Sequence, residues 1–233
     1  MLDTRKQTLL QLIVEDYIQS AEPVGSKQLL QRHRLDVSSA TIRNEMAVLE
    51  QEGYLRQPHT SAGRVPTEQA YLYYLQQVMQ PTRDRRRLDW EEPDDDGESV
   101  GTALRRLAKR LVEISGETAI LAMEPNVGYY AGVSNLFAKP DFSDVEMMRA
   151  LSATVDQFDD VVAQVYPLVS EQTVVYVGSH NPFGGEMATV IVKYHAGDLA
   201  EGLLGLIGPL RMDYRRNIAL VEQAKEAITQ LYG

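Results

Sequence analysis

Apolar residues recur every three or four positions in three consecutive segments at the start of the chain, which is the spacing of one buried face of a helix. The segments are about residues 3–20, 27–34 and 38–52. Pro23 breaks the chain between the first two, and Gly53 is placed to end the third. The side chains predicted to point inward are Leu9, Leu10, Ile13, Val14, Tyr17, Ile18, Leu29, Leu30, Ile42, Met46 and Leu49.

Short polar residues stand where each of these helices should begin. Asp3 or Thr4 precedes the first helix, Ser26 precedes the second, and Ser38 or Ser39 precedes the third. Their side-chain oxygens can accept hydrogen bonds from the first backbone N–H groups of a helix. The sequence therefore predicts three capped helices in the first 52 residues.

The pattern changes after the third helix. A short strand at 54–57 is followed by the polar loop PHTSAGR at 58–64 and an extended segment, and Thr67 begins a further helix. The order of helix, helix, turn, helix, strand, loop and strand is typical of a winged helix-turn-helix. We therefore predict such a domain over residues 1–79.

Residues 80–101 interrupt the apolar pattern. Four arginines between positions 83 and 87 are followed by seven acids between Asp89 and Glu98, with few apolar residues among them. A segment whose charges occur in blocks of one sign, with few apolar residues, cannot bury enough surface to become ordered. It is predicted to be a charged linker that separates two domains.

Residues 102–233 return to apolar patterns that mix helices with strands. Ser143 opens a capping box with Glu146, and apolar spacing then continues to Val165, which predicts one long helix. Continuous apolar runs predict buried strands. The predicted fold class is therefore α+β, with helices at 102–115 and 214–231 and strands at 118–123, 128–137, 173–178, 187–195 and 201–208.

The distribution of charge bears on which partners are possible. The net charge of −10 disfavours polyanions at long range. Residues 1–79 carry eight Lys and Arg against nine Asp and Glu, whereas residues 80–233 carry fifteen against twenty-four. The first domain is nearly neutral, so one of its faces can be locally positive.

The outward positions of the third helix carry small, uncharged or apolar side chains, whereas a solvated face normally carries Glu and Lys. Reading a major groove needs residues that let the helix approach, an amide for adenine and methyl groups for thymine. Hydroxyls at a helix N-terminus can hold a phosphate. The simpler interpretation is that this helix is merely solvated. The candidate DNA-binding residues are Ser38, Ser39, Ala40, Thr41, Arg43, Asn44, Ala47 and Val48.

The loop at 58–64 supplies hydroxyls, a flexible backbone and a cation, as a loop beside a phosphate backbone or in a minor groove requires. Ser, Gly and Pro are common in any polar turn. Close to a helix-turn-helix, however, they favour nucleic-acid binding. The candidate residues of the loop are His59, Thr60, Ser61, Gly63 and Arg64.

Several function classes are excluded or disfavoured. The chain has no cysteine, so disulfides and thiolate metal sites are excluded. No motif of a serine hydrolase, P-loop enzyme or zinc protease occurs, and the four histidines are scattered. We expect no catalytic residues, metal or cofactor. The start of the chain is not typical of a secretory signal, and no apolar run approaches about 18 residues. These features predict a cytoplasmic protein without a membrane partner.

The sequence resembles the HrcA heat-inducible transcription repressors. VEDYIQSAEPVGSKQL, SSATIRNEMAVLEQEGYLRQPHTSAGRVPT and YLYYL are similar to the DNA-binding domain of that family. GYYAGVSNLFAKPDFSD and LGLIGPLRMDYRRNIALVE, at about 129–145 and 203–222, are similar to its two C-terminal signatures. The resemblance thus covers both predicted domains.

The resemblance implies a homodimeric repressor of chaperone genes that binds an inverted repeat of the CIRCE type. It also implies a GAF-like effector and dimerisation domain at 102–233 and help in folding from the GroE chaperonin. This chain is shorter than usual, because only GETAILAMEPNV stands where family members have a long segment with an inserted dimerisation subdomain.

Two other functions stay open on the residues alone. The winged helix could serve a protein partner, in which case duplex binding would show no salt dependence. Alternatively, the GAF-like domain could sense a small molecule. The polar candidates for such a pocket are His180, Asn181, His195 and Asp198, which are also ordinary residues of turns.

Overall fold

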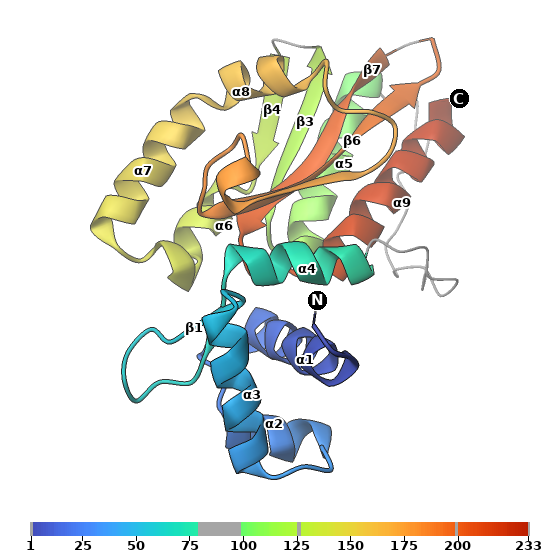
Figure 1. The fold of residues 1–233 in the computed structure, drawn as a ribbon. Coiled ribbons are helices and arrows are strands. Elements are labelled where there is room, and N and C mark those ends of the chain that lie inside the picture. Colours follow the sequence, from blue (N-terminus) through green and yellow to red (C-terminus); the bar gives the residue numbers. More distant parts are fainter. Residues whose placement is uncertain (1, 79–98, 125–126, 199, 233) are drawn as a thin grey trace. The chain divides into compact units, whose positions relative to one another are not determined.

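The computed structural model of the protein describes residues 2–78, 99–124, 127–198 and 200–232 (Figure 1). The chain divides into two compact units, Met1–Pro81 and Thr82–Gly233, named here the N-terminal and C-terminal units. The predicted linker at 80–101 lies almost wholly outside the described residues. Its last two residues, Val100 and Gly101, are already helical.

The N-terminal unit contains four helices and a two-stranded sheet among its described residues. The capping prediction is confirmed at two helices, because Asp3 accepts the Lys6 N–H at 2.9 Å and Ser38 accepts the Thr41 N–H at 3.1 Å. The elements are α1 (Thr4–Ser20), α2 (Ser26–His33), α3 (Ser39–Gln51), β1 (Leu55–Arg56), β2 (Val65–Pro66) and α4 (Glu68–Val78).

The prediction that Ser26 caps the second helix is wrong. Gly25 occupies the N-cap, and Ser26 is the first residue of α2. The Ser26 hydroxyl oxygen instead lies 2.9 Å from that of Ser39, at the start of α3. It therefore joins the N-termini of the two helices.

The core of the N-terminal unit is formed by the inward faces of its helices. A large aliphatic side chain stabilises the fold by about 1.5–3 kcal/mol when it is fully buried. The unit buries at least six such side chains almost completely. They are Leu10, Ile13, Leu29, Ile42, Leu49 and Leu55.

The sheet of the N-terminal unit is very short. Antiparallel β1 and β2 pair Leu55 with Pro66 and Arg56 with Val65. Val24 extends this ladder, because it pairs with Arg64 through two backbone hydrogen bonds of 2.8 and 2.9 Å. The segment before α2 therefore holds the end of the loop between β1 and β2.

The C-terminal unit is built on a five-stranded antiparallel sheet of order β4-β3-β7-β6-β5. It confirms the predicted α+β class, and a sheet with flanking helices is consistent with a GAF-like domain. The strands are β3 (Thr118–Glu124), β4 (Val127–Ala131), β5 (Val174–Val177), β6 (Met187–Ala196) and β7 (Ala200–Pro209). The helices are α5 (Val100–Ser115), α6 (Val133–Ala138), α7 (Val145–Asp156), α8 (Phe158–Val165) and α9 (Tyr214–Tyr232), with 3-10 turns at Pro140–Phe142 and Gly178–His180.

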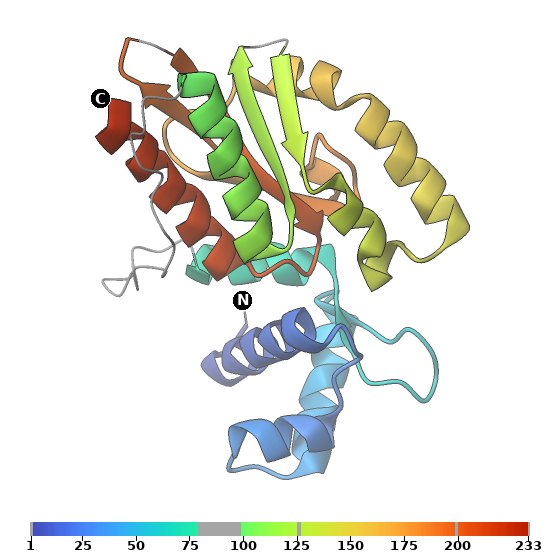
Figure 2. The same ribbon diagram turned by 180° about the vertical axis from the view of Figure 1, so that it is seen from behind.

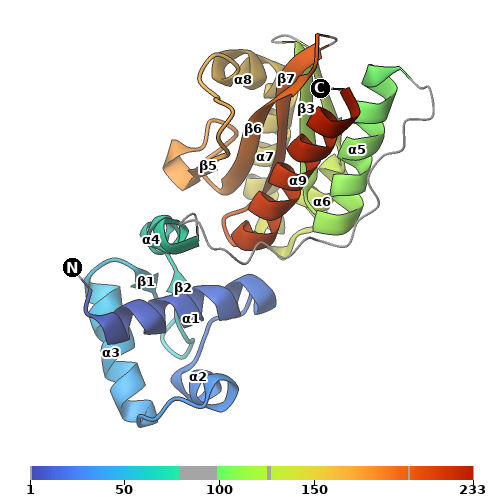
Figure 3. The same ribbon diagram turned by 90° about the vertical axis from the view of Figure 1, so that its right-hand side faces the viewer.

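Helices cover both faces of this sheet. Figures 2 and 3 show α5 and α9 side by side on one face, where α9 contacts β6 and α5 contacts β3. On the other face, Phe158 and Val162 of α8 share a buried cluster with Ile191 and Ile207 of the sheet. The central strands are therefore buried on both faces, which explains why they read as continuous apolar runs.

Two predicted elements of this unit are shorter than expected. The strand predicted at 128–137 ends at Ala131, because Gly132 adopts a φ of 74° and is the N-cap of α6. The long helix predicted from Ser143 is divided at Gln157, whose N–H donates to Thr154 O at 3.0 Å and ends α7. Its cap is Asp144 and not Ser143, since the Asp144 carboxylate accepts the N–H of Glu146.

Within the described ranges, no helix combines the length and apolarity that crossing a membrane would need.

Candidate nucleic-acid interface

The solvent face of α3 is narrower than predicted. Ala40, Arg43 and Asn44 are exposed, whereas Thr41, Ala47 and Val48 are half-buried. The exposed strip therefore consists of one small residue, one amide and one cation. Its chemistry still suits close approach to base edges and phosphates.

The two serines at the start of α3 have structural roles. Ser38 is exposed, but its hydroxyl caps the helix and lies 2.9 Å from the Thr41 hydroxyl. Ser39 is half-buried and contacts Ser26. The predicted phosphate contacts from these side chains would compete with the bonds that they already make.

The loop between β1 and β2 exposes three of its predicted residues, His59, Thr60 and Ser61. The Ala62 N–H donates to His59 O at 2.9 Å and closes a tight turn. Below that turn, the Gln57 side-chain amide donates to Thr60 O at 2.9 Å and to Ala62 O at 3.0 Å. Gln57 was not predicted from the sequence, because nothing in its local pattern indicates a side chain that hydrogen-bonds across the loop.

Gly63 lies where a backbone approaches closely. A Cβ atom at this position would stand 2.4 Å from Val24 O, so only glycine fits without a shift. Gly63 was predicted only as a flexible residue of a DNA-binding loop, whereas the backbone that it accommodates here is that of Val24.

Arg64 lies against α3, and its predicted contact with DNA stays a prediction. Its guanidinium donates from Nε to Glu50 Oε2 at 2.9 Å, and Nη2 lies 2.8 Å from the same oxygen. Only 18% of the Arg64 side chain is exposed. As placed, this cation is directed to α3 and not to solvent.

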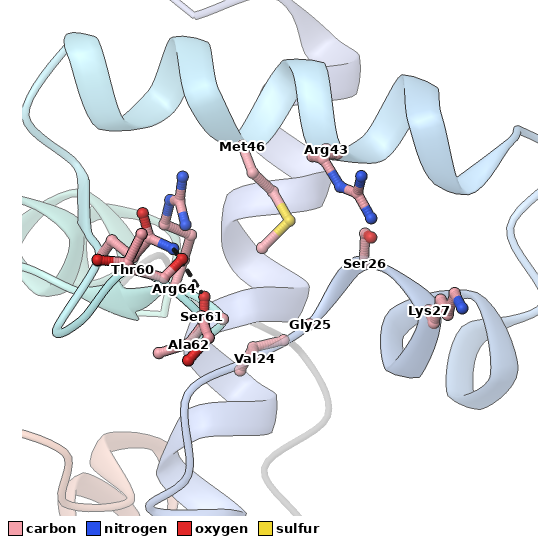
Figure 4. Close-up of a pocket in the computed structure, with 12 residues that line it drawn as sticks. Val24, Gly25, Ser26, Lys27, Arg43, Met46, Thr60, Ser61, Ala62 and Arg64 are labelled. Atoms are coloured by element: carbon pink, nitrogen blue, oxygen red, sulfur yellow. Dashed lines mark hydrogen bonds between the residues drawn. The ribbon is translucent and has the colours of Figure 1, made fainter.

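A cleft of about 490 Å³ lies between the start of α2, α3 and the loop. Figure 4 shows Arg43 and Met46 pointing into it from α3, opposite the loop residues. Lys27, the second residue of α2, also lines the cleft. It was not predicted from the sequence as a site residue. The lining residues are Val24, Gly25, Ser26, Lys27, Arg43, Met46, Gln57, Thr60, Ser61, Ala62, Gly63 and Arg64.

The charge in this cleft is positive, although the chain is acidic. No carboxylate is among the lining residues. Two acids of α3 are paired with cations, since Glu45 pairs with Arg5 and Glu50 pairs with Arg64, which itself lines the cleft. The exposed Lys27 and Arg43 have no ion-pair partner in the described part of the chain, so they give the cleft a local positive potential.

The candidate ligand-binding residues of the C-terminal unit do not converge. Asn181 is buried and accepts the Phe183 N–H at 3.2 Å and the Thr189 hydroxyl at 3.0 Å. Thr189 stands near the start of β6, whereas His195 stands near its end, beside the carboxylates of Glu171 and Glu201. His180 and Asp198 are exposed. Within the described ranges, no group of three or more histidines and acids could hold a metal ion.

Comparison with known proteins gives consistent results. The family model described as the HrcA protein C terminal domain matches residues 76–218. The chain is similar to the heat-inducible transcription repressor HrcA of Halalkalibacterium halodurans, with 25% identity over 336 aligned positions that cover 99% of this chain and 98% of the relative. It is 48% identical to the repressor of the same name from Bifidobacterium longum, over 66% of this chain but 39% of that relative.

Among solved structures, the chain is similar to a protein described as hypothetical, whose crystal structure was determined at 2.2 Å resolution. The TM-score is 0.79 at 18% sequence identity, with 100% of this chain and 99% of that chain covered. This similarity shows a shared fold.

Proposed function

The chain belongs to the HrcA family, and from this membership we propose that it represses transcription by binding duplex DNA through its N-terminal unit, a winged helix-turn-helix. The family relationship makes it a regulator of transcription and not an enzyme. In the proposal, α3 enters the major groove while residues 58–63 lie along the sugar-phosphate backbone. Lys27 and Arg43 contact phosphates.

The observation that supports this proposal best is the cation-lined cleft beside the exposed strip of α3. A helix can read bases only if nearby groups hold the backbone in register. Lys27, Arg43 and the hydroxyl-bearing Thr60 and Ser61 line that cleft and offer such groups. The acids of α3 that would repel phosphates are neutralised by Arg5 and Arg64.

We further propose that two copies bind an inverted repeat of the CIRCE type upstream of chaperone genes, with folding assisted by the GroE chaperonin. One unit of this size contacts too little DNA for tight specific binding, whereas a two-fold dimer engages two half-sites at once. Heating would release the repressor if it loosened the C-terminal unit and with it the spacing of the two DNA-binding units.

A gel-shift experiment tests this proposal. An inverted-repeat duplex, a duplex with one half-site and a scrambled duplex are titrated with the full chain at 50 and 200 mM salt. We expect tighter binding to the inverted repeat and a loss of affinity with salt, because phosphate contacts release counterions. Equal affinity for a scrambled duplex, or affinity that is independent of salt, would reject DNA recognition.

Coupling to temperature needs a second measurement. Operator affinity and hydrogen exchange in the C-terminal unit are followed across the same temperatures. Release of DNA well below any loss of protection in that unit would reject the coupling.

A further inference from the structure

Arg64 is held on two sides. Its side chain meets Glu50 Oε2 through Nε at 2.9 Å and Nη2 at 2.8 Å. Its backbone N–H donates to Val24 O at 2.9 Å, and its carbonyl accepts the Val24 N–H at 2.8 Å. The residue thus connects the end of the loop to α3 and to the segment before α2.

This arrangement disfavours a phosphate contact by Arg64. Two of its three guanidinium nitrogens face Glu50, and turning the whole group toward DNA would leave that carboxylate unpaired beside the phosphates. Like charges at close range in a partly desolvated site are unfavourable. Lys27 and Arg43 are exposed and can meet phosphates without breaking an ion pair.

Gln57 restrains the other end of the loop. Its amide group donates two hydrogen bonds, to Thr60 O and Ala62 O, and so fixes the curvature of the segment between them. His59, Thr60 and Ser61 remain exposed at the tip. Since β1 and β2 have only two residues each, the ladder alone restrains the loop weakly.

We infer that Glu50 and Gln57 are positioning residues for DNA binding: Glu50 holds Arg64 as a brace between α3 and the loop, and Gln57 shapes the loop tip. This inference rests on the proposed function. The brace fixes the distance between the helix that reads bases and the loop that contacts the backbone. Arg64 therefore contributes to affinity through geometry and not through a phosphate.

A charge swap distinguishes a brace from a phosphate contact. The variants are Arg64→Gln, Glu50→Gln and the double variant Glu50→Arg with Arg64→Glu, whose net charge equals that of the parent. Binding of the full chain to a fluorescein-labelled inverted-repeat duplex is measured between 50 and 200 mM salt. We expect each single variant to lose about tenfold in affinity, since a hydrogen-bonded charged pair is broken.

The double variant should regain most of that affinity. Its salt slope, the change of log affinity with log salt concentration, should equal that of the parent. Arg43→Gln is the matched control, because removal of a phosphate contact should lower the slope by about one. If the double variant binds as poorly as Arg64→Gln and both show the reduced slope, Arg64 is a phosphate ligand and the inference is overturned. If the parent itself shows no salt-dependent binding, the proposed function fails instead.

Gln57→Met provides an independent test, because methionine has a similar length but no donor. We expect about fivefold weaker binding with an unchanged salt slope and faster hydrogen exchange at the Ala62 amide. Parental affinity together with the faster exchange would show that the loop shape does not matter for binding. Circular dichroism of each variant confirms that the fold is retained.

Discussion

The two units differ in how a carboxylate holds a cation from a distant segment. In the N-terminal unit, the Glu50 and Arg64 side chains are 33% and 18% exposed. In the C-terminal unit, Glu117 is only 6% exposed and lies 3.1 Å from Lys139. The two cations are similarly exposed, at 18% for Arg64 and 22% for Lys139, so the pairs differ in the burial of the carboxylate. Breaking the pair with the buried carboxylate should therefore cost more stability.

The pair of Glu117 and Lys139 lies close to a second ion pair. Arg211 donates from Nε and Nη2 to the Asp141 carboxylate at 2.8 and 2.7 Å. Glu117 Oε2 is buried and has no hydrogen-bond partner. Burial raises the pKa of Glu117 to about 7, although the nearby Lys139 opposes the shift. The C-terminal unit thus contains an acid that changes charge near neutral pH.

The largest expected effect comes from Lys139→Met. Without its cation, the buried Glu117 carboxyl must stay ionised or take up a proton, which at pH 9, two units above its pKa of about 7, costs up to about 2.7 kcal/mol. The lost hydrogen bond to Lys139 adds about 1 kcal/mol, so the free energy of unfolding should fall by about 3.5 kcal/mol at pH 9. Hydrogen exchange of β3 amides measures the loss in the C-terminal unit. Lys225→Met is the control, because its partner Glu171 is 67% exposed and the expected loss is under about 1 kcal/mol. Similar losses in both variants would remove the distinction between the buried and exposed pairs.

A smaller effect concerns pH. The folded pKa of Glu117 is raised from 4.5 to about 7, so the folded state binds the proton more tightly than the unfolded state. Stability from this group is therefore greatest below about pH 4.5 and is lost as pH rises to about 7, by about 3 kcal/mol in total. Denaturant unfolding at several pH values should show the decline. In Glu117→Gln it should be absent, and a decline of parental size would assign the proton elsewhere.

Gly63→Ala should have an intermediate effect in the N-terminal unit. The added Cβ would meet Val24 O at 2.4 Å and force the loop from the segment before α2. We expect a loss of about 2 kcal/mol in stability and weaker DNA binding. Gly25→Ala is the control, since a Cβ there has open space. A normal melting temperature for Gly63→Ala would show that the loop is not held as described.

The smallest effect on stability is expected for Lys27→Ala. This exposed side chain has no ion-pair partner in the described part of the chain, so the change should stay within about 0.5 kcal/mol. Its effect should appear in DNA binding, where the salt slope falls by about one. An unchanged slope would exclude Lys27 from the phosphate contacts and leave Arg43 as the main cation of the cleft.

Local chemistry allowed part of the fold to be predicted from the sequence. Asp3 and Ser38 were recognised as caps because a cap needs only a short polar side chain before an apolar helical pattern. The break at Gly132 was missed, since GYYAGVSNLF has the apolar and aromatic character of a strand, and only the positive φ of one residue ends it.

The candidate site was predicted less completely, because its geometry depends on residues distant in sequence. Arg64 was recognised as a cation in a loop, but Glu50 stands fourteen positions earlier on a helix and has the pattern of any surface acid. Lys27 enters the cleft only because α2 packs beside α3. A weak signal for it existed in the Gly-Ser-Lys run at a helix start, where exposed N–H groups and a cation coincide.

The order of the strands in the sheet has a consequence for synthesis of the protein. β3 is flanked by β4 and β7, and Ala122 pairs with Leu203, so about 80 further residues must leave the ribosome before this pairing can form. At about 5–20 residues per second, the nascent chain carries that apolar segment unprotected on one edge for roughly 4–16 seconds. β6 and β7, in contrast, are adjacent in the chain and can pair as a hairpin as soon as both have left the ribosome. A newly made polypeptide is thus most exposed to aggregation just before its last strand is translated.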